Sequence, residues 1–118
     1  MTPSEYQNPI LCADYSDPDI VRVGDDFFMV SSSFNHVPAL PILHSTDLVN
    51  WTIINHVMDE LPLPGYDRYQ PGKGVWAPSI RWHDGKLWVC FSTPDEGIFI
   101  CHTEDPWGEW SAPHCLRE

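Results

Sequence analysis

The chain has 118 residues, of which 42% are hydrophobic and 13% aromatic, enough for one small core, and this excludes a disordered protein. Seventeen acidic side chains against six Lys and Arg give a net charge of −11, and such a surface repels phosphate backbones and anionic lipid. We therefore expect no nucleic-acid partner and no membrane partner, and a neutral ligand suits this charge better.

The N-terminus and the cysteines bear on the cellular compartment. Residues 1–5 lack the basic and apolar regions of a signal peptide, so the protein is either cytosolic or its leader has been removed. The cysteines show no C-x-x-C spacing, which argues against a zinc site. Cys90 and Cys101 lie on neighbouring predicted strands and could pair, although unpaired thiols are the simpler expectation.

Four short strands are predicted in the first half of the chain. They are rich in β-branched and aromatic residues and cover residues 20–23, 27–32, 40–44 and 51–54. A tight turn at Gly24–Asp25–Asp26 joins the first two, which indicates an antiparallel pair.

The second half gives the same succession of elements. Strands are predicted at residues 80–82, 87–92 and 98–102 and in a short stretch near Trp110, with a turn at 83–85. No segment shows a 3.6-residue period with helix caps, so we expect an all-β fold.

The two halves repeat each other at a nearly constant spacing. Pro18–Asp19–Ile20 recurs as Pro78–Ser79–Ile80, and His44–Ser45–Thr46–Asp47 is echoed by His102–Thr103–Glu104–Asp105. Two antiparallel four-stranded units of this length are typical of propeller blades. An eight-stranded sandwich is the competing fold, but it does not predict that each unit repeats its turn and its Trp, Trp51 and Trp110, in the same order.

This repeat sets the expected domain organisation. We place blade 1 at about residues 17–57, a linker rich in Pro and Gly at about 58–73, and blade 2 at about 74–118. Propellers close with about four to eight blades, so we interpret the chain as the N-terminal part of a longer propeller.

One acidic residue breaks the repeat. Asp17 precedes the proline of the first copy, whereas Ala77 precedes the proline of the second. Residues shared by both copies are framework, so an acid present in only one is a candidate for chemistry. The alternative is that Asp17 merely closes a turn, as Asp does before many strands. Pro18 favours an extended backbone at Asp17.

Several motifs in the right order resemble those of a known family. They are Asn8–Pro9–Ile10, Asp14–Tyr15–Ser16–Asp17–Pro18–Asp19–Ile20, Pro41–Ile42–Leu43–His44–Ser45–Thr46–Asp47 and Gly74–Val75–Trp76–Ala77–Pro78. Over essentially its whole length the chain resembles glycoside hydrolase family 43, most closely the β-xylosidase and α-L-arabinofuranosidase branch. The resemblance implies a five-bladed β-propeller, of which this chain supplies about the first two four-stranded blades.

The resemblance also implies a mechanism and its residues. The family inverts the anomeric carbon in a single displacement, with a carboxylate base, a carboxylic acid and a third, tuning carboxylate. The base position corresponds to Asp17, whereas the acid and the tuning carboxylate belong to later sequence, so we expect the 118-residue segment alone to be inactive. The resemblance implies that Trp76 and Phe34 line the sugar subsite; core packing is the alternative for each.

Other positions depart from the family or have simpler explanations. Asn35 and His36 depart from the family pattern, which leaves the sugar preference open. Asp19 replaces a small residue and is expected either to disturb the water held by Asp17 or to face solvent. His44 and His102 occupy equivalent repeat positions, which explains them better than a metal site does. The remaining tryptophans are assigned mostly to core or inter-blade packing: Trp51, Trp82, Trp88, Trp107 and Trp110.

The expected partners follow from this interpretation. The substrate is an oligosaccharide or polysaccharide of the xylan or arabinan type, and the remainder of the propeller, or self-association, covers the unpacked blade faces. We expect no cofactor or metal in this segment; the resemblance implies an axial calcium ion in the complete propeller. A non-catalytic carbohydrate-binding propeller is the main alternative. A protein-interaction propeller is a weaker one, because the WD dipeptide is absent.

Overall fold

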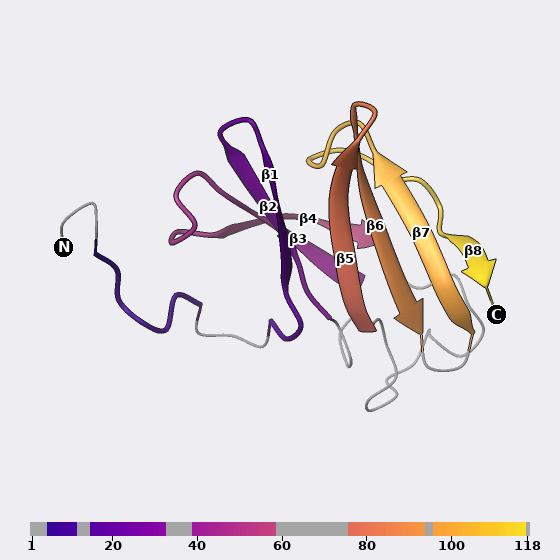
Figure 1. The fold of residues 1–118 in the computed structure, drawn as a ribbon, viewed down its shortest axis with the longest axis horizontal. Coiled ribbons are helices and arrows are strands. Elements are labelled where there is room, and N and C mark those ends of the chain that lie inside the picture. The colour runs from indigo at the N-terminus through magenta and orange to yellow at the C-terminus, as the bar shows by residue number, and fades with distance from the viewer. Residues whose placement is uncertain (1–4, 12–14, 33–38, 59–75, 94–95, 118) are drawn as a thin grey trace.

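In the part of the chain that the structure describes, eight strands form two antiparallel four-stranded sheets that lie side by side (Figure 1). The computed structural model describes residues 5–11, 15–32, 39–58, 76–93 and 96–117. The strands, in chain order within each sheet, are β1 (Asp19–Val23), β2 (Asp26–Val30), β3 (Ala39–Ser45), β4 (Thr52–Met58), β5 (Trp76–His83), β6 (Lys86–Thr93), β7 (Gly97–Thr103) and β8 (His114–Arg117). The all-β prediction is confirmed, and the described part of the chain has no helix long and apolar enough to cross a membrane.

The two sheets repeat not only their order but also their register. Equivalent positions face each other in both: Ile20 opposite Met29 and Ile80 opposite Val89, Val30 opposite Ile42 and Cys90 opposite Ile100, Ile42 opposite Asn55 and Ile100 opposite His114. The correspondence read from the sequence therefore holds residue by residue. The linker predicted at 58–73 lies, apart from Met58, outside the described residues, and the blade boundaries stay a prediction.

Two-residue turns, shorter than the three-residue turns predicted, join the first two strands of each sheet. In the second sheet both turn residues have positive φ, 54° at Asp84 and 72° at Gly85. This is the requirement of a type I′ turn, whose twist matches that of the flanking strands. In the first sheet Gly24, with φ of 64°, supplies the positive φ at the first turn position.

The position predicted for the last strand is wrong. Strand β8 begins at His114, not near Trp110. The segment near Trp110 still touches β7, because Ser111 N–H donates to the His102 carbonyl at 2.8 Å and the Ser111 hydroxyl accepts from His102 N–H at 2.9 Å. Trp110 packs partly buried against the core, as predicted for it.

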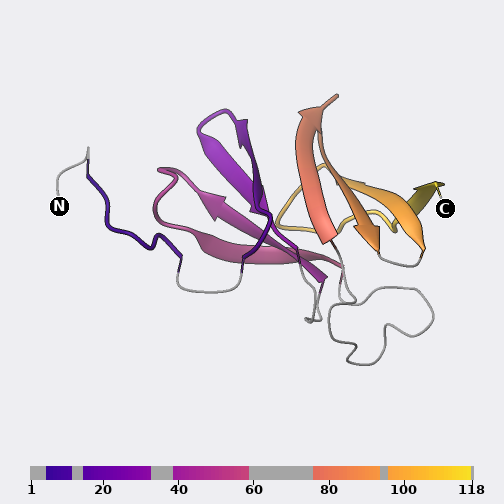
Figure 2. The ribbon, with the colours of Figure 1, turned by 60° about the horizontal axis from the view of Figure 1, so that its bottom comes forward.

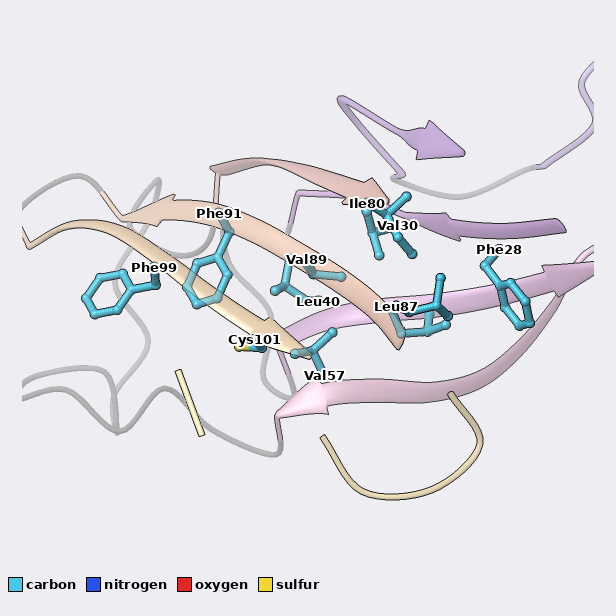
Figure 3. Close-up of a cluster of buried hydrophobic side chains, with 11 residues drawn as sticks. Phe28, Val30, Leu40, Val57, Ile80, Leu87, Val89, Phe91, Phe99 and Cys101 are labelled. Carbon is cyan, nitrogen blue, oxygen red and sulfur yellow. The ribbon is translucent and has the colours of Figure 1, made fainter. Parts of the chain in front are cut away.

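The hydrophobic core lies between the two sheets (Figure 3). Side chains alternate along each strand, so that on β6 Leu87, Val89 and Phe91 are buried while their neighbours point away. The core residues are Phe28, Val30, Leu40, Ile42 and Val57 from the first sheet and Ile80, Leu87, Val89, Phe91, Phe99 and Cys101 from the second. Figure 3 shows Val30 beside Ile80, where β1 and β2 meet β5.

A hydrogen bond and an ion pair of Asp19 connect the two sheets at one edge. The Asp19 Oδ2 atom accepts from Ile80 N–H at 2.9 Å and from the Arg81 guanidinium at 2.8 Å. Asp19 therefore does not simply face solvent, whereas the alternative that it disturbs a water at Asp17 stays a prediction. Partial burial raises the pKa of Asp19, but the Ile80 hydrogen bond and the Arg81 charge outweigh it, and this pKa lies below its ordinary value of 3.8.

Asp19→Ala should lower the free energy of unfolding by about 1–3 kcal/mol, because the N–H of fully buried Ile80 loses its acceptor. Since the folded pKa is depressed, the charge-dependent stabilisation by Asp19 is present above pH 3.8 and is lost as the pH falls below that value. Urea unfolding at pH 7 and pH 3 measures both effects. Exposed Glu104→Ala is the control, and an equal loss in the two variants would contradict the assignment.

A loop of the second sheet also reaches over the first. The Trp107 ring lies 5.5 Å from Phe28 and 5.1 Å from His44, and the Asn55 amide donates to the carbonyls of Pro106 at 3.2 Å and Gly108 at 2.6 Å. Trp107 is 52% exposed, but its ring contacts residues of the first sheet, in line with the predicted inter-blade packing.

Two other sequence-based assignments fare differently. Trp82 is 44% exposed, so its assignment to packing is wrong; it lies at the turn end of β5, beyond the reach of the core. Cys90 and Cys101 are both free thiols, because they point to opposite faces of the second sheet. Burial raises the pKa of Cys101 to about 12.

Candidate active site

Asp17 lies immediately before β1 in an uncommon backbone conformation. Its φ is 49°, and the equivalent Ala77 has φ of 37°. The extended backbone expected from the following proline is therefore not observed. The preference of a residue before proline for an extended backbone is outweighed here by the pairing of the neighbouring chain segment. The Ser32 N–H donates to the Ser16 carbonyl at 2.9 Å. Both copies of the repeat share this turn, so it belongs to the framework.

The comparison with Ala77 also bears on the role of the Asp17 carboxylate. A non-glycine residue with positive φ is uncommon, and Asp tolerates it better than Ala. Ala77 nevertheless adopts the same conformation without any side-chain oxygen. The turn therefore does not require the carboxylate, which argues against a purely structural role for it.

Ser32 connects Asp17 to the second sheet. Its hydroxyl donates to Asp17 Oδ2 at 2.9 Å and accepts from Ala77 N–H at 2.7 Å. Ser32 is only 5% exposed, whereas Asp17 is exposed. Within the described residues, this hydroxyl is the hydrogen-bond partner of the Asp17 carboxylate. A buried group thus fixes one carboxylate oxygen while the side chain stays accessible to solvent.

Trp76 lies at the same place. It is the first residue of β5, is 37% exposed, and directly precedes the Ala77 amide that Ser32 binds. Because β1 and β5 are in contact, the starts of both strands bring Asp17, Ser32 and Trp76 to one edge of the molecule. The other predicted pocket residue, Phe34, lies outside the described residues, as do Asp14, Asn35 and His36.

The two equivalent histidines have different partners. His44 Nε2 lies 2.7 Å from Asp26 Oδ1, whereas the ring of His102 stacks at 4.8 Å on Trp88. No group of three or more His, Cys, Asp or Glu side chains in the described ranges is arranged to hold a metal ion. The axial calcium ion implied by the family resemblance stays a prediction.

A hollow of about 400 Å³ lies elsewhere in the structure, on the face of the second sheet that points away from the first. Its lining residues are Ser79, Arg81, His83, Trp88, Cys90 and Ile100. None of them is a predicted site residue. The exposed edge at Asp17 is therefore the better candidate, because a catalytic carboxylate needs access to water and substrate.

The described residues thus form repeated four-stranded antiparallel sheets, with the accessible Asp17 carboxylate before the first strand where the second copy has Ala77. Residues 6–118 match glycosyl hydrolases family 43, and the chain belongs to this family. It is 41% identical to a xylosidase/arabinosidase from Butyrivibrio fibrisolvens, over 94% of this chain and 22% of that protein. It is 38% identical to a non-reducing end alpha-L-arabinofuranosidase from Bacteroides ovatus, over 92% of this chain and 21% of that protein.

A solved structure gives the same result. The chain matches the crystal structure of a xylan beta-1,4-xylosidase from Bacillus halodurans C-125 with a TM-score of 0.81 and 30% identity, over 92% of this chain and 22% of that one. The chain thus spans about a fifth of the length of the relatives it matches.

Proposed function

We propose that the complete protein is a glycoside hydrolase acting on xylan-type or arabinan-type pentose glycosides, as a β-xylosidase, an α-L-arabinofuranosidase or both. The names of the similar proteins support the substrate class. The fold of the complete protein is a five-bladed β-propeller, and the two sheets described above are its first two blades. The observation that carries the chemistry is the accessible Asp17 carboxylate, held by a buried hydroxyl on a backbone that its repeat partner forms without an acid.

Asp17 acts as the general base of an inverting single displacement. Its carboxylate takes a proton from a water, the water oxygen attacks the anomeric carbon, and the glycosidic C–O bond breaks on the opposite face of the sugar. A carboxylic acid from another part of the complete protein protonates the leaving oxygen. In inverting enzymes the carboxyl groups of this acid and of the base lie about 6.5–9.5 Å apart. Ser32 restrains Asp17, so the carboxylate meets the water in a fixed orientation.

Aromatic side chains beside the base bind the sugar. Trp76 is partly exposed next to the Ala77 amide, and its ring suits the C–H surface of a pentose. The family resemblance is our reason for assigning Phe34 to the same sugar subsite. Substrate binding to these rings accounts for sugar affinity, whereas Asp17 accounts for turnover.

Hydrolysis of aryl β-xylosides and aryl α-L-arabinofuranosides tests the proposal. The complete protein should hydrolyse at least one of them with inversion, seen by NMR of the first-formed anomer. With unactivated aryl leaving groups, the purified 118-residue chain should hydrolyse neither, because such a group departs only when an acid protonates it. Binding of xylo- or arabino-oligosaccharides by the complete protein without turnover would instead favour a non-catalytic propeller. Turnover by the 118-residue chain would mean that the acid lies within it.

A further inference from the structure

The turn between β6 and β7 places a second carboxylate at the edge of the molecule that holds Asp17. The Thr93 hydroxyl at the end of β6 donates to Glu96 Oε2 at 2.6 Å, and Thr93 is only 5% exposed whereas Glu96 is half-buried. A buried hydroxyl thus holds one oxygen of a partly accessible carboxylate, as Ser32 does for Asp17. The proposed mechanism gives Glu96 no role.

The repeat distinguishes Glu96 in the same way as it distinguishes Asp17. Residues 34–39 of the first copy include no acidic residue, whereas the corresponding segment of the second copy contains Glu96. An acid that only one copy has is not required by the framework that both copies share. A bond that merely closes the turn is the alternative for the contact with Thr93, so the position of the carboxylate has to decide between them.

Both carboxylates lie at the same end of the two sheets. Figure 2 shows β1 and β5 beginning, and β6 ending, at the lower edge of the sheets. Trp76, the first residue of β5, pairs with the residue before Thr93. Thr93 is one of the buried positions of β6 that face the first sheet, and the bridge from Asp17 through Ser32 to β5 also lies between the sheets. The Glu96 carboxylate is therefore on the same side of β5 and β6 as the base.

The spacing of the strands bounds the distance between the two carboxylates. Neighbouring strands lie about 5 Å apart, and one strand spacing and one turn separate the Ser32 bridge from Glu96, so the carboxylates are roughly 10–15 Å apart. The acid and the base of an inverting pair lie about 6.5–9.5 Å apart. The separation therefore favours a role of Glu96 in substrate binding over a role as the general acid.

We propose that Glu96 is a substrate-binding residue, whose carboxylate accepts a hydrogen bond from a hydroxyl of the pentose unit that packs on Trp76. This inference rests on the proposed function. A carboxylate offers about four acceptor positions, of which Thr93 uses one, and bonds to a charged acceptor are stronger than neutral ones. The ring of Trp76 and the carboxylate of Glu96 thus suit the C–H surface and the hydroxyls of one neutral sugar.

Removing the charge of Glu96 in the complete protein tests the proposal. Glu96→Gln should raise KM at least about tenfold on whichever aryl glycoside the protein hydrolyses, with kcat within a few-fold of wild type. Glutamine keeps an oxygen that can accept the Thr93 hydroxyl bond, so the turn should persist. Glu104→Gln removes the same charge at an exposed position beyond the other end of β7 and should leave KM unchanged.

Urea unfolding of the same variants tests the structural alternative. Both should be about as stable as the unmodified protein. A loss of stability in Glu96→Gln together with an unchanged KM would mean that the carboxylate only closes the turn, and would overturn the inference.

Substrate analogues that each lack one hydroxyl identify the bond itself. The analogue without the hydroxyl that Glu96 binds should bind the unmodified protein about tenfold more weakly, and Glu96→Gln should weaken its binding no further. The other monodeoxy analogues should lose the same factor on mutation as the parent glycoside. An equal factor for every analogue, or no loss for any of them, would contradict a direct bond to the sugar.

Calorimetric titration with xylo- and arabino-oligosaccharides separates this inference from the proposed function. In the complete protein with Asp17→Asn, the further change Glu96→Gln should weaken binding at least about tenfold. The same weakening in a protein that never hydrolyses these sugars would contradict the proposed function and support the contact with Glu96. Unchanged binding in a protein that does hydrolyse them would overturn the inference and leave the function standing, and a complete protein that binds neither sugar would overturn both.

Discussion

Replacing Asp17 by Asn in the complete protein should lower kcat by about 10²–10⁴ while the substrate still binds. Asparagine keeps the size of the side chain and an oxygen that can accept the Ser32 hydroxyl bond, but it cannot take a proton from the attacking water. The Ala77 backbone shows that the turn tolerates the loss of charge. Steady-state kinetics on an aryl β-xyloside and an aryl α-L-arabinofuranoside measure the effect.

Two controls make this result specific. Asp14→Asn and Asp19→Asn should change kcat far less, and the loss in Asp19→Asn should appear in stability, because Asp19 is bound to Ile80 and Arg81. A good leaving group replaces the acid but not the base, so activated aryl glycosides should not rescue Asp17→Asn, whereas azide should, by replacing water as the nucleophile. If Asp17→Asn keeps near wild-type kcat on either substrate, the base assignment is wrong and Asp14 becomes the next candidate.

Ser32→Ala in the complete protein should lower kcat by roughly 10–100-fold with little change in KM. Hydrogen bonds to charged groups contribute about 1.5–3 kcal/mol, and about 1.4 kcal/mol corresponds to a factor of ten in rate. The mutation frees the Asp17 carboxylate and also leaves Ala77 N–H without its acceptor. Because Ser32 is buried, it should act on the position of the base and not on substrate binding.

The neighbouring serine provides the matched control for this prediction. Ser31 is fully buried, but its hydroxyl makes only a 3.5 Å contact, to the Ser32 carbonyl. Ser31→Ala should therefore leave kcat within a few-fold of wild type, and Ser32→Thr, which keeps the hydroxyl, should recover most of the activity. Equal losses in Ser31→Ala and Ser32→Ala would mean that general packing, not the hydroxyl, supports the base.

The presence of the strands could be predicted from this sequence, but the residues at which they begin and end could not. The apolar alternation of β6 and the repeated Gly-containing turns mark the sheets clearly. Strand β8 was misplaced because the described side chains of His114, Cys115 and Leu116 are all exposed, which leaves no burial pattern to detect. Backbone pairing to β7 defines that strand, and only the structure shows it.

The residues of the candidate site also differ in whether the sequence alone could reveal them. Asp17 could be found because it breaks the repeat, whereas Ser32 could not, because Ser92 occupies the equivalent position and both resemble framework. The contacts of Asp19 were missed because its partners, Ile80 and Arg81, lie about sixty positions away in the sequence. The replacement of Asp19 by Ser79 in the second copy was the one available signal, a second acid without a repeat partner.

In the proposed mechanism, the hydroxyl shared between Asp17 and Ala77 makes the angle between the two sheets a determinant of how the base is positioned. A small hinge rotation at this joint would stretch one of the two Ser32 hydrogen bonds while every strand remained paired. Activity should then disappear at a lower denaturant concentration than the circular dichroism signal of the sheets, since local opening needs less free energy than global unfolding. The position of the Asp17 carboxylate therefore depends on the contact between the neighbouring repeats. Substitutions in the core that the two sheets share can alter turnover without contacting the sugar.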